Sequence, residues 1–208
     1  EGHLLRESVD PEGHPGTAHV RLLDLRPGAS RQVGDLLREL RQEGTHYLVL
    51  DLRTNAGGAE EEVRAVADLF LEEGEILRVV GRGGEELRTY EAREGTLFSG
   101  DLALLVGSGT VGEAEALAAA LKENGRAKLL GSRTLGKSLL QQFITFDDGT
   151  AVHLSVEEYR GPGGLEFHGE GVPPDLVVAD SSKEEEDPVL DAALDRLHEK
   201  DSAPAEAA

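Results

Sequence analysis

The chain has 208 residues, enough for one domain with a substantial core, and its formal net charge at pH 7 is -20. This charge argues against binding to nucleic acid or to anionic membrane surfaces, because both carry the same sign. The sequence has no cysteine, which excludes disulfide bonds and thiol catalysis, and no apolar run long enough to span a bilayer.

The first part of the chain alternates between patterns typical of strands and of helices. Residues 1–16 are polar with scattered Gly and Pro, which predicts a flexible arm. Residues 19–25 alternate as a strand does, and a helix is expected to begin at Ser30 as its N-cap and to end at Gly44. The apolar run 47–52 predicts a central strand covered on both faces.

A glycine pair follows this central strand. Gly57 and Gly58 lie in a loop that leads into a helix with Val63 and Val66 on its inward face. A Gly-Gly loop between a strand and a helix exposes backbone N–H groups that can bind an anion. From the residues alone, the loop is equally well a tight turn, with residues 60–62 complementing the helix dipole.

A hairpin of residues 75–80 and 86–90 and a buried strand at 101–106 precede the stretch that carries the chemistry. Thr110 and Glu113 fit a capping box at the start of a helix that ends at residues 124–125. Gly112 would then lie in the first turn, where N–H groups favour a nucleophile and an oxyanion. A serine there is expected to be tolerated at least as well as glycine, because glycine lowers helix stability.

Residues 131–138, GSRTLGKS, match the phosphate-binding pattern G-x-x-x-x-G-K-[ST]. That pattern requires a helix opening at the lysine. The residues that follow alternate and turn at residues 147–149, which predicts a hairpin of 142–146 and 150–156 instead. A P-loop nucleotide site at Gly131–Ser138 is therefore the weakest interpretation, and we predict no nucleotide binding.

The last part of the chain predicts a Gly-rich loop at 159–171, a short strand at 176–179 and a final amphipathic helix that starts at residues 187–188. The expected organisation is an α/β core of residues 17–180, a C-terminal helix within 181–200 and a disordered tail at 201–208. The segment before the core is too short for a PDZ domain. The seven histidines show no metal-ligand spacing, so no metal is predicted.

Several motifs in the same order resemble those of the carboxyl-terminal processing peptidases, also called tail-specific proteases. They are DLRTNAGG at 51–58, NGRAKLLGSRTLGK at 124–137 and GVPPD at 171–175, within a similarity that runs from about residue 19 to 178. The resemblance implies a crotonase-like (Clp-protease-like) ββα superhelix core with added β-hairpins. It also implies a serine endopeptidase of the Ser-Lys type that cleaves polypeptides near their C-termini, needs no cofactor and lies outside the cytoplasm.

The resemblance implies roles for individual residues. Lys137 would be the general base and Gln141 would orient it. The oxyanion hole would be formed by backbone N–H groups of Gly57, Gly58 and Glu113. The position that matches the nucleophilic serine is Gly112, and glycine has no side chain with which to form an acyl-enzyme. The chain is therefore expected to be inactive in this form.

Two functional hypotheses remain beside the nucleotide site. One is a peptidase core without its nucleophile, whose neighbouring hydroxyls at Ser108, Thr110 and Ser138 do not replace the missing serine. The other is a non-catalytic module that uses the inherited cleft for a peptide or a lipophilic ligand. The retinoid-binding modules of the interphotoreceptor protein, which resemble this fold, are a precedent for such a loss.

Overall fold

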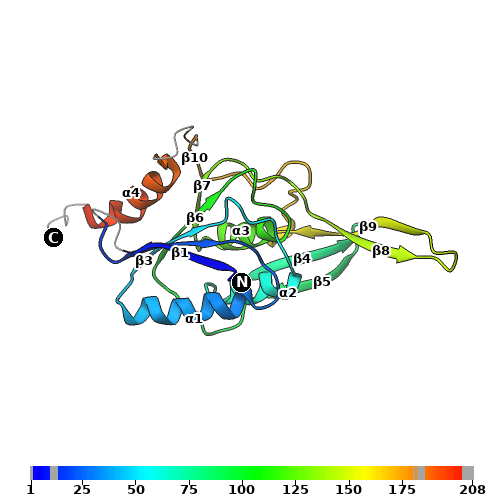
Figure 1. Cartoon of the computed structure of the whole chain (residues 1–208), viewed down its shortest axis with the longest axis horizontal. Coiled ribbons are helices and arrows are strands. Elements are labelled where there is room, and N and C mark those ends of the chain that lie inside the picture. Colours follow the sequence, from blue (N-terminus) through cyan, green and yellow to red (C-terminus); the bar gives the residue numbers. More distant parts are fainter. Residues whose placement is uncertain (1, 10–13, 180, 182–185, 203–208) are drawn as a thin grey trace.

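The computed structural model describes residues 2–9, 14–179, 181 and 186–202, and these form a mixed α/β fold (Figure 1). A larger sheet has the spatial order β1-β2-β3-β6-β7-β10 and a smaller sheet the order β5-β4-β9-β8. The larger sheet contains β1 (Leu4–Val9), β2 (Thr17–Leu22), β3 (Tyr47–Asp51), β6 (Asp101–Val106), β7 (Lys128–Gly131) and β10 (Leu176–Val177). The smaller sheet contains β4 (Glu75–Gly81), β5 (Glu86–Glu91), β8 (Leu139–Thr145) and β9 (Ala151–Arg160). The α helices are α1 (Ala29–Gln42), α2 (Glu60–Asp68), α3 (Glu113–Glu123) and α4 (Pro188–Ser202).

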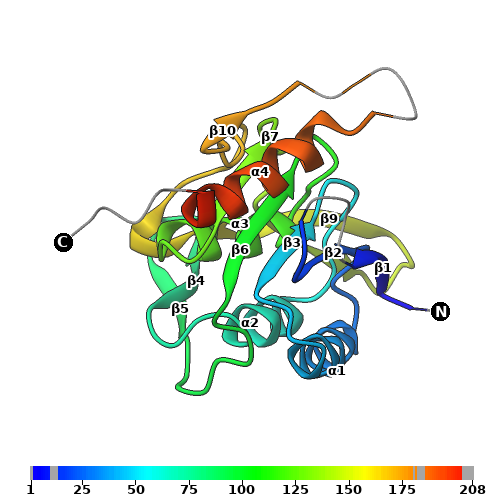
Figure 2. The ribbon, with the colours of Figure 1, turned by 90° about the vertical axis from the view of Figure 1, so that its left-hand side faces the viewer.

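The central strands are apolar because helices cover both faces of the larger sheet (Figure 2). Alternate residues of β3 point to opposite faces, so Leu48 and Leu50 pack in the core with α1, α2 and α3, whereas Val49 packs with α4. The strands β2, β3, β6 and β7 are parallel neighbours, with Leu50 opposite Leu104. Their carboxyl ends therefore meet at one edge of the sheet, where the chain leaves for its functional loops.

The N-terminal segment is more ordered than predicted. Where a flexible arm was expected over residues 1–16, Leu4–Val9 forms β1 and pairs antiparallel with β2, with Leu4 opposite Leu22. The imidazole of His3 also contacts the carboxylate of Asp24, with 2.5 Å between Nδ1 and Oδ1. The polar composition reflects an edge strand with its outer side in water, which sequence alone does not distinguish from an arm. Residues 10–13 lie outside the described part of the chain.

Helix α1 does not use Ser30 as its cap, contrary to the prediction. Its N-cap is Gly28, in the left-handed conformation with φ 102°. The carboxylate of Glu62, from the first turn of α2, accepts the N–H groups of Gly28 at 2.8 Å and of Ser30 at 2.7 Å. The cap thus comes from a residue more than thirty positions away, which local capping rules cannot anticipate.

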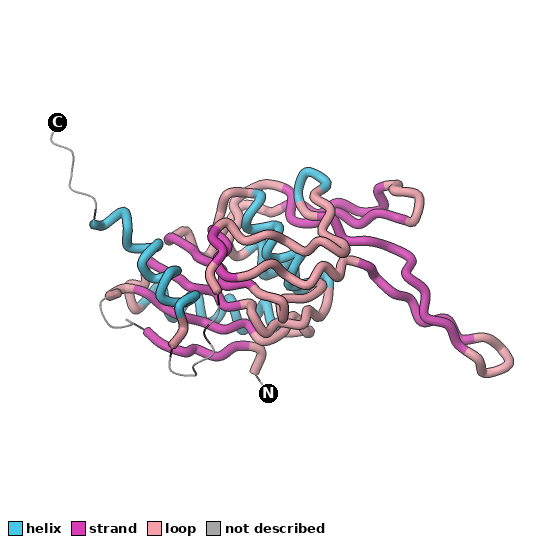
Figure 3. Tube along the Cα trace, turned by 90° about the horizontal axis from the view of Figure 1, so that it is seen from above, coloured by secondary structure: helices cyan, strands magenta, loops and turns pink. Residues whose placement is uncertain are grey.

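The hairpin after the Gly-Lys loop is longer than predicted, because β8 and β9 extend over Leu139–Thr145 and Ala151–Arg160. It projects away from the body of the molecule (Figure 3). Its base is held by β4, which pairs Val79 with Tyr159. Tyr159 was expected in a loop and instead is a buried residue of β9.

The C-terminal helix begins at Pro188 and includes residues 201–202, which were expected in a disordered tail. Residues 182–185 and 203–208, on which parts of the predicted helix and tail fall, lie outside the described residues. None of the described helices is long and apolar enough to cross a membrane.

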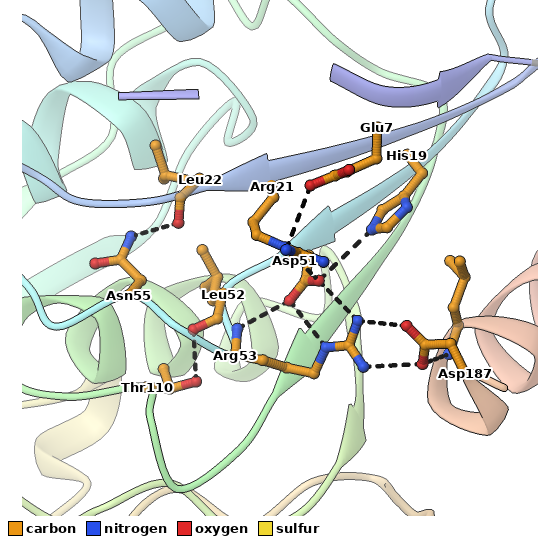
Figure 4. A network of polar contacts seen from close by, with 11 residues as sticks. Glu7, His19, Arg21, Leu22, Asp51, Leu52, Arg53, Asn55, Thr110 and Asp187 are labelled. Atoms are coloured by element: carbon orange, nitrogen blue, oxygen red, sulfur yellow. Dashed lines mark hydrogen bonds and ion pairs between the residues drawn. The ribbon is translucent and has the colours of Figure 1, made fainter. Parts of the chain in front are cut away.

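A network of charges fastens α4 to the sheet (Figure 4). Buried Asp51, at the end of β3, accepts hydrogen bonds from the Arg53 backbone N–H at 2.9 Å and guanidinium at 2.8 Å. The same guanidinium donates to Asp187, just before α4, at 2.6 and 2.8 Å. Burial by itself would raise the pKa of Asp51, but neighbouring His19 and Arg53 hold that pKa well below its usual range. Burial by itself would also raise the pKa of Asp187, but the hydrogen bonds and charge of Arg53 outweigh burial and lower that pKa.

We predict that Asp187→Asn lowers the free energy of unfolding at pH 7 by about 1–3 kcal/mol, because it removes charge-assisted hydrogen bonds to Arg53. Asparagine preserves the N-cap function of this position, so the change isolates the ion pair. The folded-state pKa of Asp187 lies below its unfolded value, so its contribution is fully present above about pH 4 and is lost as the pH falls further.

Denaturant unfolding between pH 7 and pH 2 measures this effect, and the difference between the two proteins should shrink on acidification. Asp195→Asn, at an exposed position of the same helix, is the matched control and should change stability by less than about 0.5 kcal/mol. Equal effects of the two substitutions at pH 7 would contradict the role assigned to Arg53 and Asp187.

Candidate active site

Three loops meet at the carboxyl ends of β3, β6 and β7. They comprise residues 52–59, 107–112 and 132–138. Backbone hydrogen bonds join them: the Val111 N–H donates to the Asn55 carbonyl at 3.0 Å, and the Leu135 N–H donates to the Thr110 carbonyl at 3.2 Å. The start of α3 is therefore held between the Gly-Gly loop and the Gly-Lys loop.

The predicted capping box at Thr110 and Glu113 is wrong. Helix α3 begins at Glu113 with Gly112 as its N-cap. The buried Thr110 hydroxyl donates to the Leu52 carbonyl at 2.8 Å and accepts the Gly107 N–H at 3.1 Å. Thr110 thus ties the end of β6 to the end of β3, two segments that are distant in sequence, and the local capping pattern gave no indication of this.

Gly112 has a backbone conformation that side chains rarely adopt, with φ 61° and ψ -117°. A Cβ built there would meet only the Lys137 carbonyl oxygen, at an ordinary 3.8 Å, so the space is open and the backbone is the constraint. Serine at this position would carry strain of about 1–3 kcal/mol, contrary to the expectation that it is tolerated as well as glycine. Nucleophiles of other hydrolases occupy similarly strained turns between a strand and a helix.

A buried carboxylate joins the two halves of this site. Glu115 is fully buried in the first turn of α3. Its Oε1 accepts the Thr134 hydroxyl at 2.5 Å and the Gly136 N–H at 2.6 Å. Its Oε2 accepts the N–H groups of Lys137 at 2.7 Å and Gly112 at 3.0 Å. Glu115 was not predicted as a site residue. The available indication was its position in a helix that is otherwise rich in Ala and Leu and buried on all sides.

The structure places the backbone of Lys137 beside Gly112 but leaves its side chain exposed. Gln141 follows on the exposed strand β8, opposite Ser155 of β9. Within the described residues, neither the Lys137 ammonium nor the Gln141 amide makes a hydrogen bond or an ion pair. The two side chains predicted to act together are thus near in sequence but not joined in this conformation.

The three predicted oxyanion donors differ in their partners. The N–H of Gly57 donates to the Asn55 side chain at 2.9 Å. The N–H of Gly58 donates to the Glu113 carboxylate at 3.1 Å. The N–H of Glu113 itself has no acceptor within the part of the chain that the structure describes. The Glu113 N–H is therefore the one of the three without a partner among the described residues, and the Gly58 N–H is bonded to a side chain at an exposed position.

The structure contradicts a P-loop at residues 131–138. Strand β8, not a helix, follows Lys137 and Ser138. The N–H groups of Gly136 and Lys137, which would have to bind phosphate, already donate to Glu115. No cluster of three or more His, Asp or Glu residues suited to a metal ion occurs among the described residues.

Comparisons with known proteins show the family to which this sequence is similar. The profile of peptidase family S41 matches residues 16–178. A carboxyl-terminal-processing protease of Synechocystis sp. is 33% identical over 80% of this chain and 39% of its own length. Carboxyl-terminal-processing peptidase 1 of Arabidopsis thaliana chloroplasts is 32% identical over 82% of this chain and 35% of its own length.

Solved structures show the same relationship. A photosystem II D1 C-terminal processing protease superimposes with a TM-score of 0.75 and 29% identity, over 86% of this chain and 46% of that one. A putative peptidase from Parabacteroides merdae shares the fold with a TM-score of 0.76 at 17% identity, over 98% of this chain and 67% of that one. The chain spans well under half the length of the curated relatives that it matches.

We predict that Glu115→Gln lowers the free energy of unfolding by about 3–5 kcal/mol, because the amide places an NH₂ group against backbone N–H donors in a buried site. Glu123→Gln, at an exposed position near the end of the same helix, is the control and should change stability by less than about 0.5 kcal/mol. Chemical denaturation compares the two, and similar values for both would mean that Glu115 does not hold the loops together.

We also predict that a fluorophosphonate probe leaves the unsubstituted chain unlabelled. The Thr110 hydroxyl is buried and engaged, and that of Ser138 is buried and lies 3.3 Å from the Glu158 carboxylate. Ser108 is exposed but precedes the turn that holds Gly112. Intact-mass spectrometry after prolonged incubation is the measurement, and stoichiometric labelling at any of the three would show that another hydroxyl acts as nucleophile.

Proposed function

The chain belongs to peptidase family S41, and we propose that it is the core of a carboxyl-terminal processing serine endopeptidase whose nucleophile position is held by Gly112. The observation that carries this proposal is the Glu115 carboxylate, which binds the N–H groups of Gly112 and Lys137 at once. A side chain at position 112 would therefore project toward the Lys137 backbone. In this form the chain lacks a nucleophile, so we propose that it does not catalyse hydrolysis.

Lys137 is proposed as the general base. A neutral lysine amine can take the proton of a serine hydroxyl, and its four-carbon side chain is long enough to turn toward the site from an anchored backbone. Gln141 is proposed to orient that amine. Both side chains would have to leave the exposed positions that they occupy in this conformation.

The N–H groups of Gly58 and Glu113 are proposed as the oxyanion hole. They face the start of α3, whose dipole favours negative charge. The N–H of Gly57 is less suited, because the buried Asn55 side chain accepts it and holds the glycine pair in place. The Gly58 N–H bonds the Glu113 side chain in an exposed contact, where a substrate oxygen could replace the carboxylate. Such preorganised donors are the largest single source of stabilisation in acyl transfer.

The substrate class is proposed from the relatives. Their names describe carboxyl-terminal processing, and that of one structural neighbour describes processing of the photosystem II D1 protein. For this chain we propose polypeptides bound near their C-termini, as substrates if a nucleophile is present and as ligands otherwise. A non-catalytic peptide-binding module is therefore the second candidate, and the missing side chain at Gly112 favours it.

The finer fold assignment is also a proposal. A crotonase-like ββα superhelix is supported by α1, α2 and α3, which pack in succession on one face of the sheet, and by the parallel strands that they connect. The hairpins β4–β5 and β8–β9 would then be additions to that core.

We predict that Gly112→Ser gives slow labelling by a fluorophosphonate and slow cleavage of an unfolded protein such as casein. The rate should rise with pH, because only the neutral amine of Lys137 can accept the serine proton. The strained backbone at position 112 should lower stability by about 1–3 kcal/mol without preventing folding.

Gly112→Ala is the matched control, because it carries the same strain without a hydroxyl, and Gly112→Ser with Lys137→Ala removes the base. Both should remain unlabelled. Labelling of the introduced serine that does not depend on Lys137 would remove the proposed role of this lysine.

A further inference from the structure

A cavity of about 530 Å³ opens at the amino ends of β3 and β6, whereas the loops of the candidate active site leave from the carboxyl ends of these strands. It lies between the last turn of α1 and the segment 96–100 that precedes β6. Its volume is within the range of sites for small ligands. None of the described residues that line it is acidic, although the chain carries 41 Asp and Glu residues. The cavity is therefore a locally basic part of an acidic protein.

The segment that forms one wall of this cavity is fixed by Arg126. Its Nη2 donates to the carbonyls of Phe98 and Gly100, both at 2.8 Å. A Cβ built on Gly100 would lie 2.2 Å from the His46 carbonyl oxygen, so the backbone there is packed too closely for a side chain. The segment cannot shift without breaking these contacts, and any ligand would meet a preorganised backbone.

Two backbone donors of this wall are free. The N–H groups of Ser99 and Gly100 have no acceptor within the described part of the chain. In a trans peptide the N–H and the C=O point in opposite directions, so the Ser99 N–H points away from Arg126, which holds the Phe98 carbonyl. Successive unpaired N–H groups on a fixed backbone can form an anion-binding site.

Another part of the lining supplies a permanent positive charge. Arg41 lies in the last turn of α1 and makes no ion pair or hydrogen bond with a described residue. Arg38, three residues earlier, is instead paired with Asp35 at 2.8 Å. Arg41 complements the negative end of the α1 dipole, which accounts for a cation at this position but not for the free donors of the segment 98–100. Leu97 and buried Phe98 add apolar surface to the cavity.

We infer that this cavity is a second binding site, for a carboxylate carried by a small and otherwise uncharged body. One guanidinium and two backbone N–H groups match the charge and the two oxygens of a carboxylate. A dianion such as phosphate fits less well, because the site has one fixed cation and the chain a net charge of -20. Free organic acids and peptide C-termini both carry this chemistry. The inference does not depend on the proposed peptidase function.

The probes are N-acetyl-alanyl-alanine and isobutyrate, and the C-terminal amide of the same dipeptide is the uncharged control. In amide proton–nitrogen correlation spectra of the unsubstituted chain at constant ionic strength, both carboxylates should shift the Ser99 and Gly100 resonances saturably. The dipeptide amide should not. Gly84, in an exposed turn where a built Cβ would meet no atom, is the reference resonance and should not respond to any probe.

The same titrations separate the two sources of a carboxylate. Tighter binding of the dipeptide than of isobutyrate assigns the site to peptide C-termini, and equal or tighter binding of isobutyrate assigns it to free organic acids. The inference is overturned if neither carboxylate shifts the Ser99 and Gly100 resonances saturably, or if the dipeptide amide binds as tightly as the acid.

Arg41→Gln tests the fixed charge, and Arg38→Gln is the matched control, because Asp35 already holds that guanidinium. Both arginines are exposed, so neither substitution should prevent folding. Arg41→Gln should weaken the binding of the tighter carboxylate about tenfold or more, since it removes a charge-assisted hydrogen bond, and Arg38→Gln should change it less than about twofold. Equal effects of the two substitutions would also overturn the inference.

Discussion

The buried carboxylate of Glu115 is the constraint on which the arrangement of the site depends. It accepts hydrogen bonds from one hydroxyl and three backbone N–H groups, contributed by α3 and by the Gly-Lys loop. A charge without water is stable only when its lone pairs are satisfied, so these donors must stay in place for the chain to fold. The position of the Lys137 backbone against Gly112 is therefore a by-product of fold stability and survives whether or not the site is catalytic.

A second buried carboxylate, Asp51, fixes the other side of the same sheet edge. Asp51 accepts a hydrogen bond from Arg53, which also donates to Asp187 at the start of α4. These contacts join β3 to the C-terminal helix next to the Gly-Gly loop. Both carboxylates sit where strands end or helices begin, where backbone donors lack partners within their own element. The functional loops thus extend from a sheet whose edge is held by two hydrogen-bond networks, each centred on a buried carboxylate.

The sequence predicted those elements that depend on local pattern. Runs such as 47–52 and 101–106 are apolar because they are covered on both faces, and periodicity alone reveals that. Sequence patterns failed where the hydrogen-bond partner is distant in the chain. Ser30 is not an N-cap because Glu62 supplies the acceptor, and Thr110 is not an N-cap because its hydroxyl donates to the Leu52 carbonyl. The candidate residues were placed together by motif order, but the partners of Glu115 and Glu113 could be known only from the folded chain.

The residue at position 112 affects the stability of the turn that begins α3. Serine at position 112 would be strained at φ 61°, and glycine adopts that conformation freely, so the absence of the nucleophile relieves the backbone. The Glu113 carboxylate accepts a hydrogen bond from the Gly58 N–H, which would otherwise be exposed to solvent. Glycine at position 112 thus stabilises the folded chain while it removes the hydroxyl that acyl transfer requires, as expected when stability and activity compete at one site. The geometry around Glu115 and the missing hydroxyl at position 112 are therefore compatible, because the fold depends on the first and not on the second.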